Sequence, residues 1–116
     1  MELKIQRENG EILGLHFIQA SSLKDRMQGL MFRKELAPYD GMLIENCKSV
    51  HTFFMRFKID LIFLNDDGII IKIVRNISPY RLSGFYFSAT RVLEVKGNTL
   101  SNLLTVGEKL EISCLS

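Results

Sequence analysis

Two side chains capable of nucleophilic and acid–base chemistry, Cys47 and His51, lie close together in the sequence. They are four residues apart, so they share a side both on a helix and on an uninterrupted strand. A neighbouring histidine can stabilise a thiolate and so make the sulfur a nucleophile. Alternatively, Cys47 packs as a small apolar residue and His51 hydrogen-bonds a turn or a carboxylate. Both remain candidate catalytic residues, with either interpretation open.

Soft and imidazole metal ligands are scarce. The chain has two cysteines and two histidines, and His16 is far from the others in sequence. A four-ligand zinc site needs more such ligands at suitable spacing. We therefore expect no metal site and no cofactor, and we expect both cysteines to be free thiols.

Charged residues near the same segment form a second candidate site. Arg56 and Asp60 lie among large apolar residues, where a charge must be either paired or exposed. Arg56 could form a structural ion pair with Asp60 or Glu94, or it could position an anionic ligand. The predicted ligand-binding residues are Arg56, Asp60, Arg81 and Glu94.

Further arginines occur near the ends of expected strands, where loops gather. Arg75, Arg81 and Arg91 could join Arg56 in a positively charged mouth for a carboxylate or phosphate. The alternative is a scattered, solvated set of side chains. The spacing of the aromatic residues is more typical of a hydrophobic core than of a surface on which bases stack. The glycines occur singly and do not form a phosphate-binding loop. A nucleic-acid partner is therefore not favoured.

The elements that must position these residues are mostly short strands. Alternating or continuous apolar residues predict strands over 3–7, 12–18, 42–45, 51–60, 61–64, 69–74, 91–96 and 109–114. Ser22 can cap a short helix over 22–30, and Asn98 or Thr99 can cap a helical turn reaching Leu104. We expect the 61–64 and 69–74 hairpin to form the buried centre of the sheet. The predicted fold is α+β, mainly β: a small curled, antiparallel-rich sheet or barrel-like domain with two short helices.

Composition sets the class of protein. The 116 residues are 47% hydrophobic with a net charge of +2, which predicts a single folded domain over residues 1–116. The longest apolar runs are far shorter than the roughly 20 residues that span a bilayer, so no membrane span is expected. No signal peptide is recognised, and we expect a cytoplasmic protein unless a leader has been removed.

Several short motifs occur in a specific joint order. They are Arg26-Met-Gln-Gly-Leu-Met-Phe-Arg33, then Gly41-Met-Leu43, then the segment from Cys47 to Asp60, then Pro79-Tyr80 and Val92-Leu-Glu94. In these motifs the chain resembles the domain of unknown function 192 family, although Lys58 stands where that family usually has proline and Tyr80 where tryptophan is frequent. The resemblance implies a compact β-rich domain of bacteria and archaea, and it implies no established activity, substrate or cofactor.

Three functional hypotheses follow. The first is a non-catalytic binding module for a small anionic ligand or a protein segment, because no complete catalytic set is visible. The second is a thiol-dependent enzyme with Cys47 as nucleophile, His51 as base and Arg56 positioning an anionic substrate. The third is an accessory protein that joins a larger assembly through an exposed sheet edge.

Overall fold

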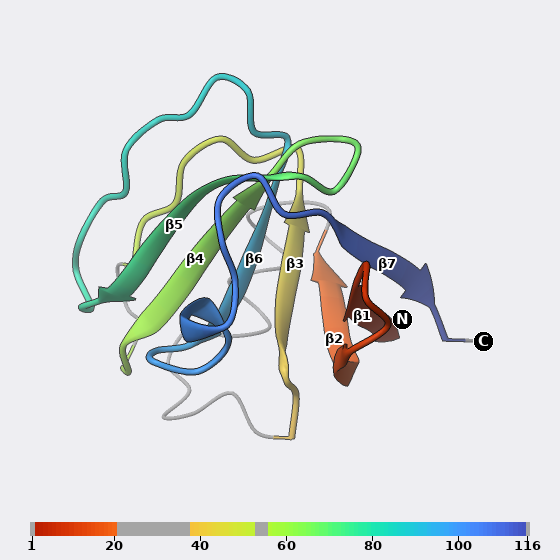
Figure 1. Cartoon of the computed structure of the whole chain (residues 1–116). Helices are drawn as coiled ribbons and strands as arrows, with labels where there is room; N and C mark the ends of the chain where they lie inside the picture. The colour runs from red at the N-terminus through yellow and green to blue at the C-terminus, as the bar shows by residue number, and fades with distance from the viewer. Residues whose placement is uncertain (1, 21–37, 53–55, 116) are drawn as a thin grey trace.

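The computed structural model describes residues 2–20, 38–52 and 56–115. They form seven β-strands and one turn of 3-10 helix, joined by turns and loops. The elements are β1 (Glu2–Arg7), β2 (Ile12–Ala20), β3 (Gly41–Glu45), β4 (Ile59–Leu64), β5 (Ile70–Ile77), β6 (Arg91–Lys96), η1 (Leu100–Asn102) and β7 (Leu110–Cys114). The strands form one sheet in the order β5-β4-β6-β3-β2-β1-β7 (Figure 1). Neighbours are antiparallel except β2 and β3. The predicted mainly β, antiparallel-rich curled sheet is confirmed.

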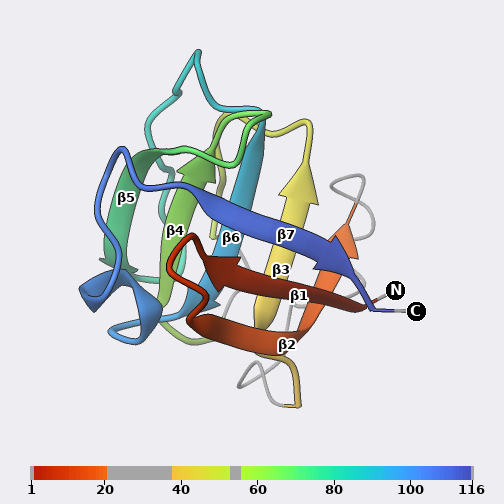
Figure 2. The ribbon, with the colours of Figure 1, turned by 45° about the vertical axis from the view of Figure 1, so that its right-hand side comes forward.

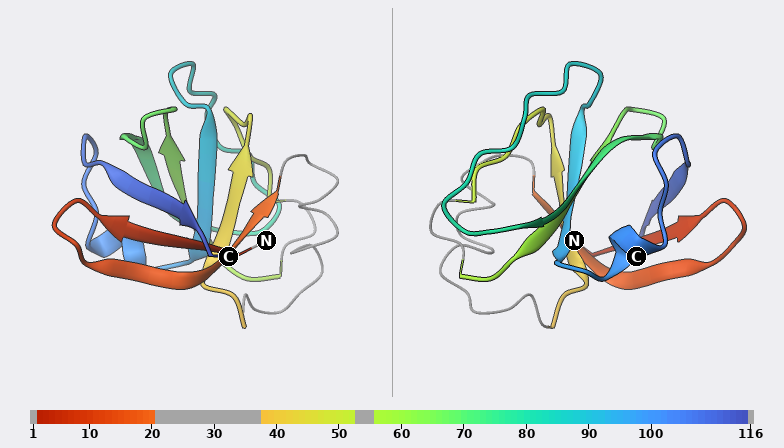
Figure 3. Two further views of the ribbon diagram at one scale, coloured as in Figure 1. Left: turned by 90° about the vertical axis from the view of Figure 1, so that its right-hand side faces the viewer. Right: turned by 60° about the vertical axis from the view of Figure 1, so that its left-hand side comes forward.

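The two edge strands, β5 and β7, meet at one end of the sheet. The amide of Ile70 donates to the carbonyl oxygen of Glu108, and the amide of Leu110 donates to that of Gly68, each at 2.8 Å. Gly68 has a φ of +82°, and a Cβ there would lie 2.4 Å from the carbonyl oxygen of Leu110. Only glycine fits such a position without strain. The sheet is therefore curled into a half-barrel (Figure 3). Its two edge strands come into contact at Gly68.

Both faces of the central strands are buried. The inner face of the half-barrel gathers side chains from all seven strands, including Leu3, Phe17, Leu43, Ile62, Ile73, Leu93 and Leu110. The outer face of β3, β4 and β6 forms a second core that includes Met42, Ile44, Leu61, Phe63 and Val92. Because β4 is covered on both sides, its sequence is apolar except for Asp60, whereas β6 keeps charged residues at its ends and Glu94 inside.

Two long segments cover part of the outer core. Residues 46–52 follow β3, residues 78–90 connect β5 to β6, and we call them together the paired loops (Figure 1). They contribute Val50, Tyr86 and Ala89 to the outer core. The function-bearing candidates Cys47, His51 and Arg81 all belong to these loops.

The helix content differs from the prediction. The helix expected over 22–30 lies outside the described residues. The second predicted helix is only the 3-10 turn η1, with Thr99 at its N-cap position and no side-chain capping hydrogen bond. The two short helices are therefore not confirmed, and within the described ranges no helix has the length and apolar character needed to cross a membrane.

Two strand predictions were also inaccurate. One was the strand expected over 51–60. In the structure, His51 makes a single isolated bridge and β4 begins only at Ile59. Residues 53–55 of this segment lie outside the described residues. The alternation there reflects a segment packed on the outer core, because Phe57 contacts that core while Arg56 and Lys58 are exposed. The other was the hairpin expected at the centre of the sheet. Its first strand, β4, does lie inside the sheet, but its second strand, β5, is an edge strand.

Candidate functional site

The paired loops run antiparallel to each other over the outer core. Main-chain hydrogen bonds join them along their length: Tyr80 to Thr52, Thr52 to Arg81, Ser83 to Val50, Tyr86 to Lys48, and Cys47 to Thr90, with distances from 2.8 to 3.0 Å. His51 and Leu82 form an isolated antiparallel bridge within this array. The loops thus form an irregular two-stranded ribbon outside the main sheet.

Side chains directed inward fix this ribbon to the protein. Buried Thr52 donates its hydroxyl to the carbonyl oxygen of Ser78 at 2.7 Å. The ring of Tyr86 packs edge-on against Phe63 of β4, with a centroid separation of 4.7 Å. Lys48 ties the end of the second loop, because its Nζ donates to the carbonyl oxygens of Phe87 at 2.7 Å and Ala89 at 2.6 Å. The ribbon is therefore held by specific bonds and by core packing.

Large apolar side chains on the other side of the ribbon face solvent. Their exposed fractions are 63% for Tyr80, 72% for Leu82, 57% for Phe85 and 83% for Phe87. The rings of Phe85 and Phe87 contact each other edge to face at 5.0 Å between centroids. Tyr80 also has a φ of +62°, a left-handed conformation that is rare for aromatic residues and typical of functional loops. Four such side chains on one loop form an exposed apolar patch, which in soluble proteins marks an interaction surface.

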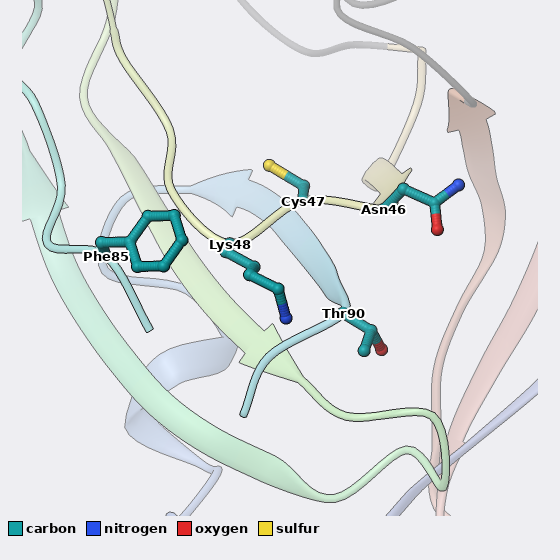
Figure 4. Close-up of a pocket in the computed structure, with 5 residues that line it drawn as sticks. All are labelled: Asn46, Cys47, Lys48, Phe85 and Thr90. Carbon is teal, nitrogen blue, oxygen red and sulfur yellow. The ribbon is translucent and has the colours of Figure 1, made fainter. Parts of the chain in front are cut away.

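A cleft opens beside this patch, with a volume of about 330 Å³. The described residues that line it are Asn46, Cys47, Lys48, Phe85 and Thr90 (Figure 4). The side chains of Cys47 and Lys48 leave the chain in opposite directions (Figure 4). The lining combines the phenyl ring of Phe85 with the polar side chains of Asn46, Lys48 and Thr90, so the cleft offers an apolar wall with polar groups beside it.

The predicted catalytic residues Cys47 and His51 both lie in the first of the paired loops. Cys47 is partly buried, and its thiol donates to the carbonyl oxygen of Ser49 at 3.0 Å. That bond requires the thiol proton, which a thiolate lacks. His51 is partly buried in its bridge to Leu82, and it is not among the residues lining the cleft. Across the described ranges, no group of three or more potential metal ligands occurs.

The predicted arginines are spread over two ends of the sheet. Arg91 begins β6 opposite Leu64, whereas Arg56 precedes Ile59 at the other end of β4. Six strand residues separate these ends, or roughly 16 Å or more at strand spacing. Arg91 donates to the carbonyl oxygens of Asn65 and Asp66. Arg56 and Arg91 therefore do not share one anion-binding mouth.

Arg81 and Arg75 lie toward the Arg56 end. Arg75 is in the second half of β5, and Arg81 follows in the second of the paired loops. Two hydrogen bonds to Thr52 fix the main chain of Arg81. The Arg81 amide donates to Thr52 Oγ1 at 2.8 Å, and the Arg81 carbonyl oxygen accepts from the Thr52 amide. Its side chain is exposed, as is that of Arg56.

The two predicted carboxylates are fully buried and lie on opposite faces of the sheet. Asp60 is opposite Val95 on the inner face, and its two carboxylate oxygens accept the amides of Asn76 at 2.6 Å and Asn98 at 3.1 Å. Glu94 is buried on the outer face, opposite Leu61. Asp60 thus links an irregularity in β5 to the turn that follows β6. Burial does not favour the direct ligand contact predicted for either carboxylate.

The residues that make up the exposed patch were not singled out by the sequence. Phe85, Tyr86 and Phe87 were all interpreted as core, yet only Tyr86 points inward. Of the residues that line the cleft, Thr90 lies outside the motifs, and Lys48 lies within the Cys47–Asp60 motif but was not chosen as a site residue. The charge pattern could have drawn attention to this region of the surface, because no Asp or Glu occurs between Gly68 and Arg91.

Comparisons with known proteins agree with this fold. A crystal structure from Sinorhizobium meliloti, described as that of a candidate transcription regulator, is 26% identical with a TM-score of 0.75, covering 94% of this chain and 90% of that one. A protein of unknown function from Novosphingobium aromaticivorans is 23% identical with a TM-score of 0.75, covering 94% and 82%, and shows the fold alone. No curated protein matches the sequence. Residues 5–112 match the model of an uncharacterised family described as "Uncharacterized ACR", and the chain therefore belongs to the DUF192 family.

Proposed function

We propose that this protein is a non-catalytic binding module that holds a protein segment against the paired loops. The observation that carries the proposal is the apolar patch of Tyr80, Leu82, Phe85 and Phe87 beside a cleft of about 330 Å³. A cleft at the small end of the range for ligand sites accommodates an anchoring side chain rather than a large cofactor. Exposed aromatic residues around such a pocket are typical of binding hot spots.

The rigidity of the ribbon supports a binding role. Lys48 fixes the carbonyls on both sides of Ser88, and Tyr86 anchors the loop between its two exposed phenylalanines. A surface that is already ordered loses little conformational entropy when a partner binds. The patch therefore combines apolar surface with a fixed shape.

The other hypotheses receive less support from the geometry. A small anionic ligand would need converging cations, but Arg91 and Arg56 lie at opposite ends of β4. A thiol enzyme would need an activated sulfur, but the Cys47 thiol donates its proton to a carbonyl oxygen. Both remain hypotheses, and we rank them below protein-segment binding.

Selection of displayed peptides tests the proposal. A library of random peptides of about 12 residues, long enough to lie along the ribbon, is selected against the immobilised protein. We expect enriched peptides whose affinity falls at least about tenfold in Phe87→Ser or Phe85→Ser, as for hot-spot truncation. Ile12→Ser is the matched control, because Ile12 is 51% exposed on β2 and remote from the loops. Far-ultraviolet circular dichroism verifies that each variant is folded.

Two outcomes contradict the proposal. One is that no peptide is enriched over a blank surface. The other is that the enriched peptides bind the two phenylalanine variants as tightly as they bind the wild type and the Ile12→Ser control.

A further inference from the structure

We infer that the segment bound at the paired loops is acidic, with an apolar anchor in the cleft and a carboxylate beside Arg81; this inference rests on the proposed function. The paired loops contain Lys48 and Arg81 and no Asp or Glu. The absence of acidic residues continues through β5, where Lys72 and Arg75 are the charged residues. The ribbon and the adjacent edge strand therefore carry a positive charge.

The hydrogen bonds of Lys48 and Arg91 leave the charge of these two cations in place. Lys48 Nζ donates to two main-chain carbonyl oxygens, which are neutral acceptors. Arg91 likewise donates to two main-chain carbonyl oxygens, and its Nε is buried with no partner among the described atoms. A cation bonded to neutral groups keeps its full charge, so it still attracts an anionic partner.

The charge also varies along the ribbon, and this variation orients the partner. Near the Thr90 end, Glu45 is paired with Arg91 in the sheet, and Asp66 lies on the turn whose carbonyl oxygens Arg91 contacts. Glu45 accepts from Gln19 at 3.2 Å and lies at the end of β3. At the Arg81 end, the carboxylate opposite the last residues of β5 is Asp60, which is fully buried on the inner face of the sheet. A bound carboxylate is therefore favoured at Arg81, and an apolar side chain in the cleft at the other end.

A membrane surface with anionic lipids also attracts apolar and basic residues. The cleft favours a peptide, because a flat lipid surface offers no single side chain to occupy a pocket lined by Phe85 and Thr90. The main-chain bonds of Arg81 also fix the position of its Cα. A fixed cation at a set distance from a pocket is suited to reading a peptide sequence.

The test compares salt dependence and charge reversal for the selected peptides. We expect the enriched sequences to contain Asp or Glu near an apolar anchor. Affinity should fall about three- to tenfold in Arg81→Glu, and raising the salt from about 0.05 M to about 0.5 M should weaken the wild type more than this variant. Lys109→Glu is the matched control, because Lys109 is exposed and bridged to Ile69 before the start of β5, whereas Arg81 follows the other end of that strand.

The outcomes separate this inference from the proposed function. If peptides bind in a Phe87-dependent manner but are indifferent to Arg81→Glu and to salt, the acidic segment is refuted and the binding module stands. If no peptide is enriched, both fail. If the protein instead sediments with vesicles of phosphatidylcholine and about one third phosphatidylserine, and Phe87→Ser abolishes this, the occupant is a membrane and the inference is overturned.

Discussion

Replacement of Asp60 by Asn would change the shape of the inner core very little but would remove a charge that holds an irregularity in β5 and the turn after β6. Asp60 is fully buried, and its oxygens accept the amides of Asn76 and Asn98. Both asparagines have left-handed φ angles, +55° and +60°, so bonds from elsewhere in the fold help to hold each of them in a sparsely populated conformation. A side-chain amide can accept only one of the two N–H groups, because its NH₂ group would face the other.

The magnitude follows from the number of charge-assisted bonds. Each hydrogen bond to a charged group contributes about 1.5–3 kcal/mol when buried, so Asp60→Asn should lower the free energy of unfolding by about that amount. Asp60→Ala removes both bonds and should lower it by about 3–6 kcal/mol. For a chain of this length, the melting temperature should fall by roughly 4 °C or more per kcal/mol.

Urea unfolding followed by far-ultraviolet circular dichroism measures the effect, because the chain has no tryptophan. We expect a lower midpoint with an unchanged slope for Asp60→Asn. Asp40→Asn is the matched control: Asp40 is exposed, and its Oδ2 accepts the His16 amide at 3.0 Å. Its loss should matter by less than about 1 kcal/mol. Equal destabilisation by the two asparagine variants, or none by Asp60→Asn, would refute this role of Asp60.

Three further predictions concern other parts of the structure. Lys48→Met should increase amide hydrogen exchange across the paired loops about tenfold or more without unfolding the sheet, since two carbonyl bonds are lost; unchanged exchange would contradict the anchoring role. Gly68→Ala should destabilise the protein by about 1–3 kcal/mol in urea, because a Cβ would collide with β7, and a neutral result would show that the edges are not joined there. In single-cysteine variants, iodoacetamide should modify exposed Cys114 faster than Cys47; the reverse order would revive the thiol-enzyme hypothesis.

The sequence was informative wherever structure is local. The turn between β4 and β5 was expected from Asn65 to Gly68, and the structure has Gly68 donating to the Asn65 carbonyl at 3.0 Å. The apolar run over 61–64 indicated a buried strand, and β4 is buried throughout. Non-local pairings were not accessible in the same way: the parallel alignment of β2 with β3 and the edge position of β5 depend on how distant segments pack.

The candidate site shows the same limit. Asp60 and Glu94 were placed in one predicted site, but the register of β4 on β6 sets them on opposite faces of the sheet. That register is a property of the assembled sheet, and a shift of one residue would reverse it. The orientation of Phe85 and Phe87 was equally hidden, because an irregular ribbon has no fixed period from which to assign inward and outward residues.

The pairing of β1 with β7 has a kinetic consequence. Leu3 is opposite Cys114, and the amide of Leu115 donates to the carbonyl oxygen of Glu2 at 3.0 Å, so the first and last strands lie side by side (Figure 2). During synthesis, β1 cannot pair with β7 until the residues between these two strands have been made. Contacts so distant in sequence slow folding, because a large loop must close before they form. A circular permutant joining these two strands by a short turn would convert the most distant pairing into a hairpin, and would be expected to fold faster while retaining the same sheet.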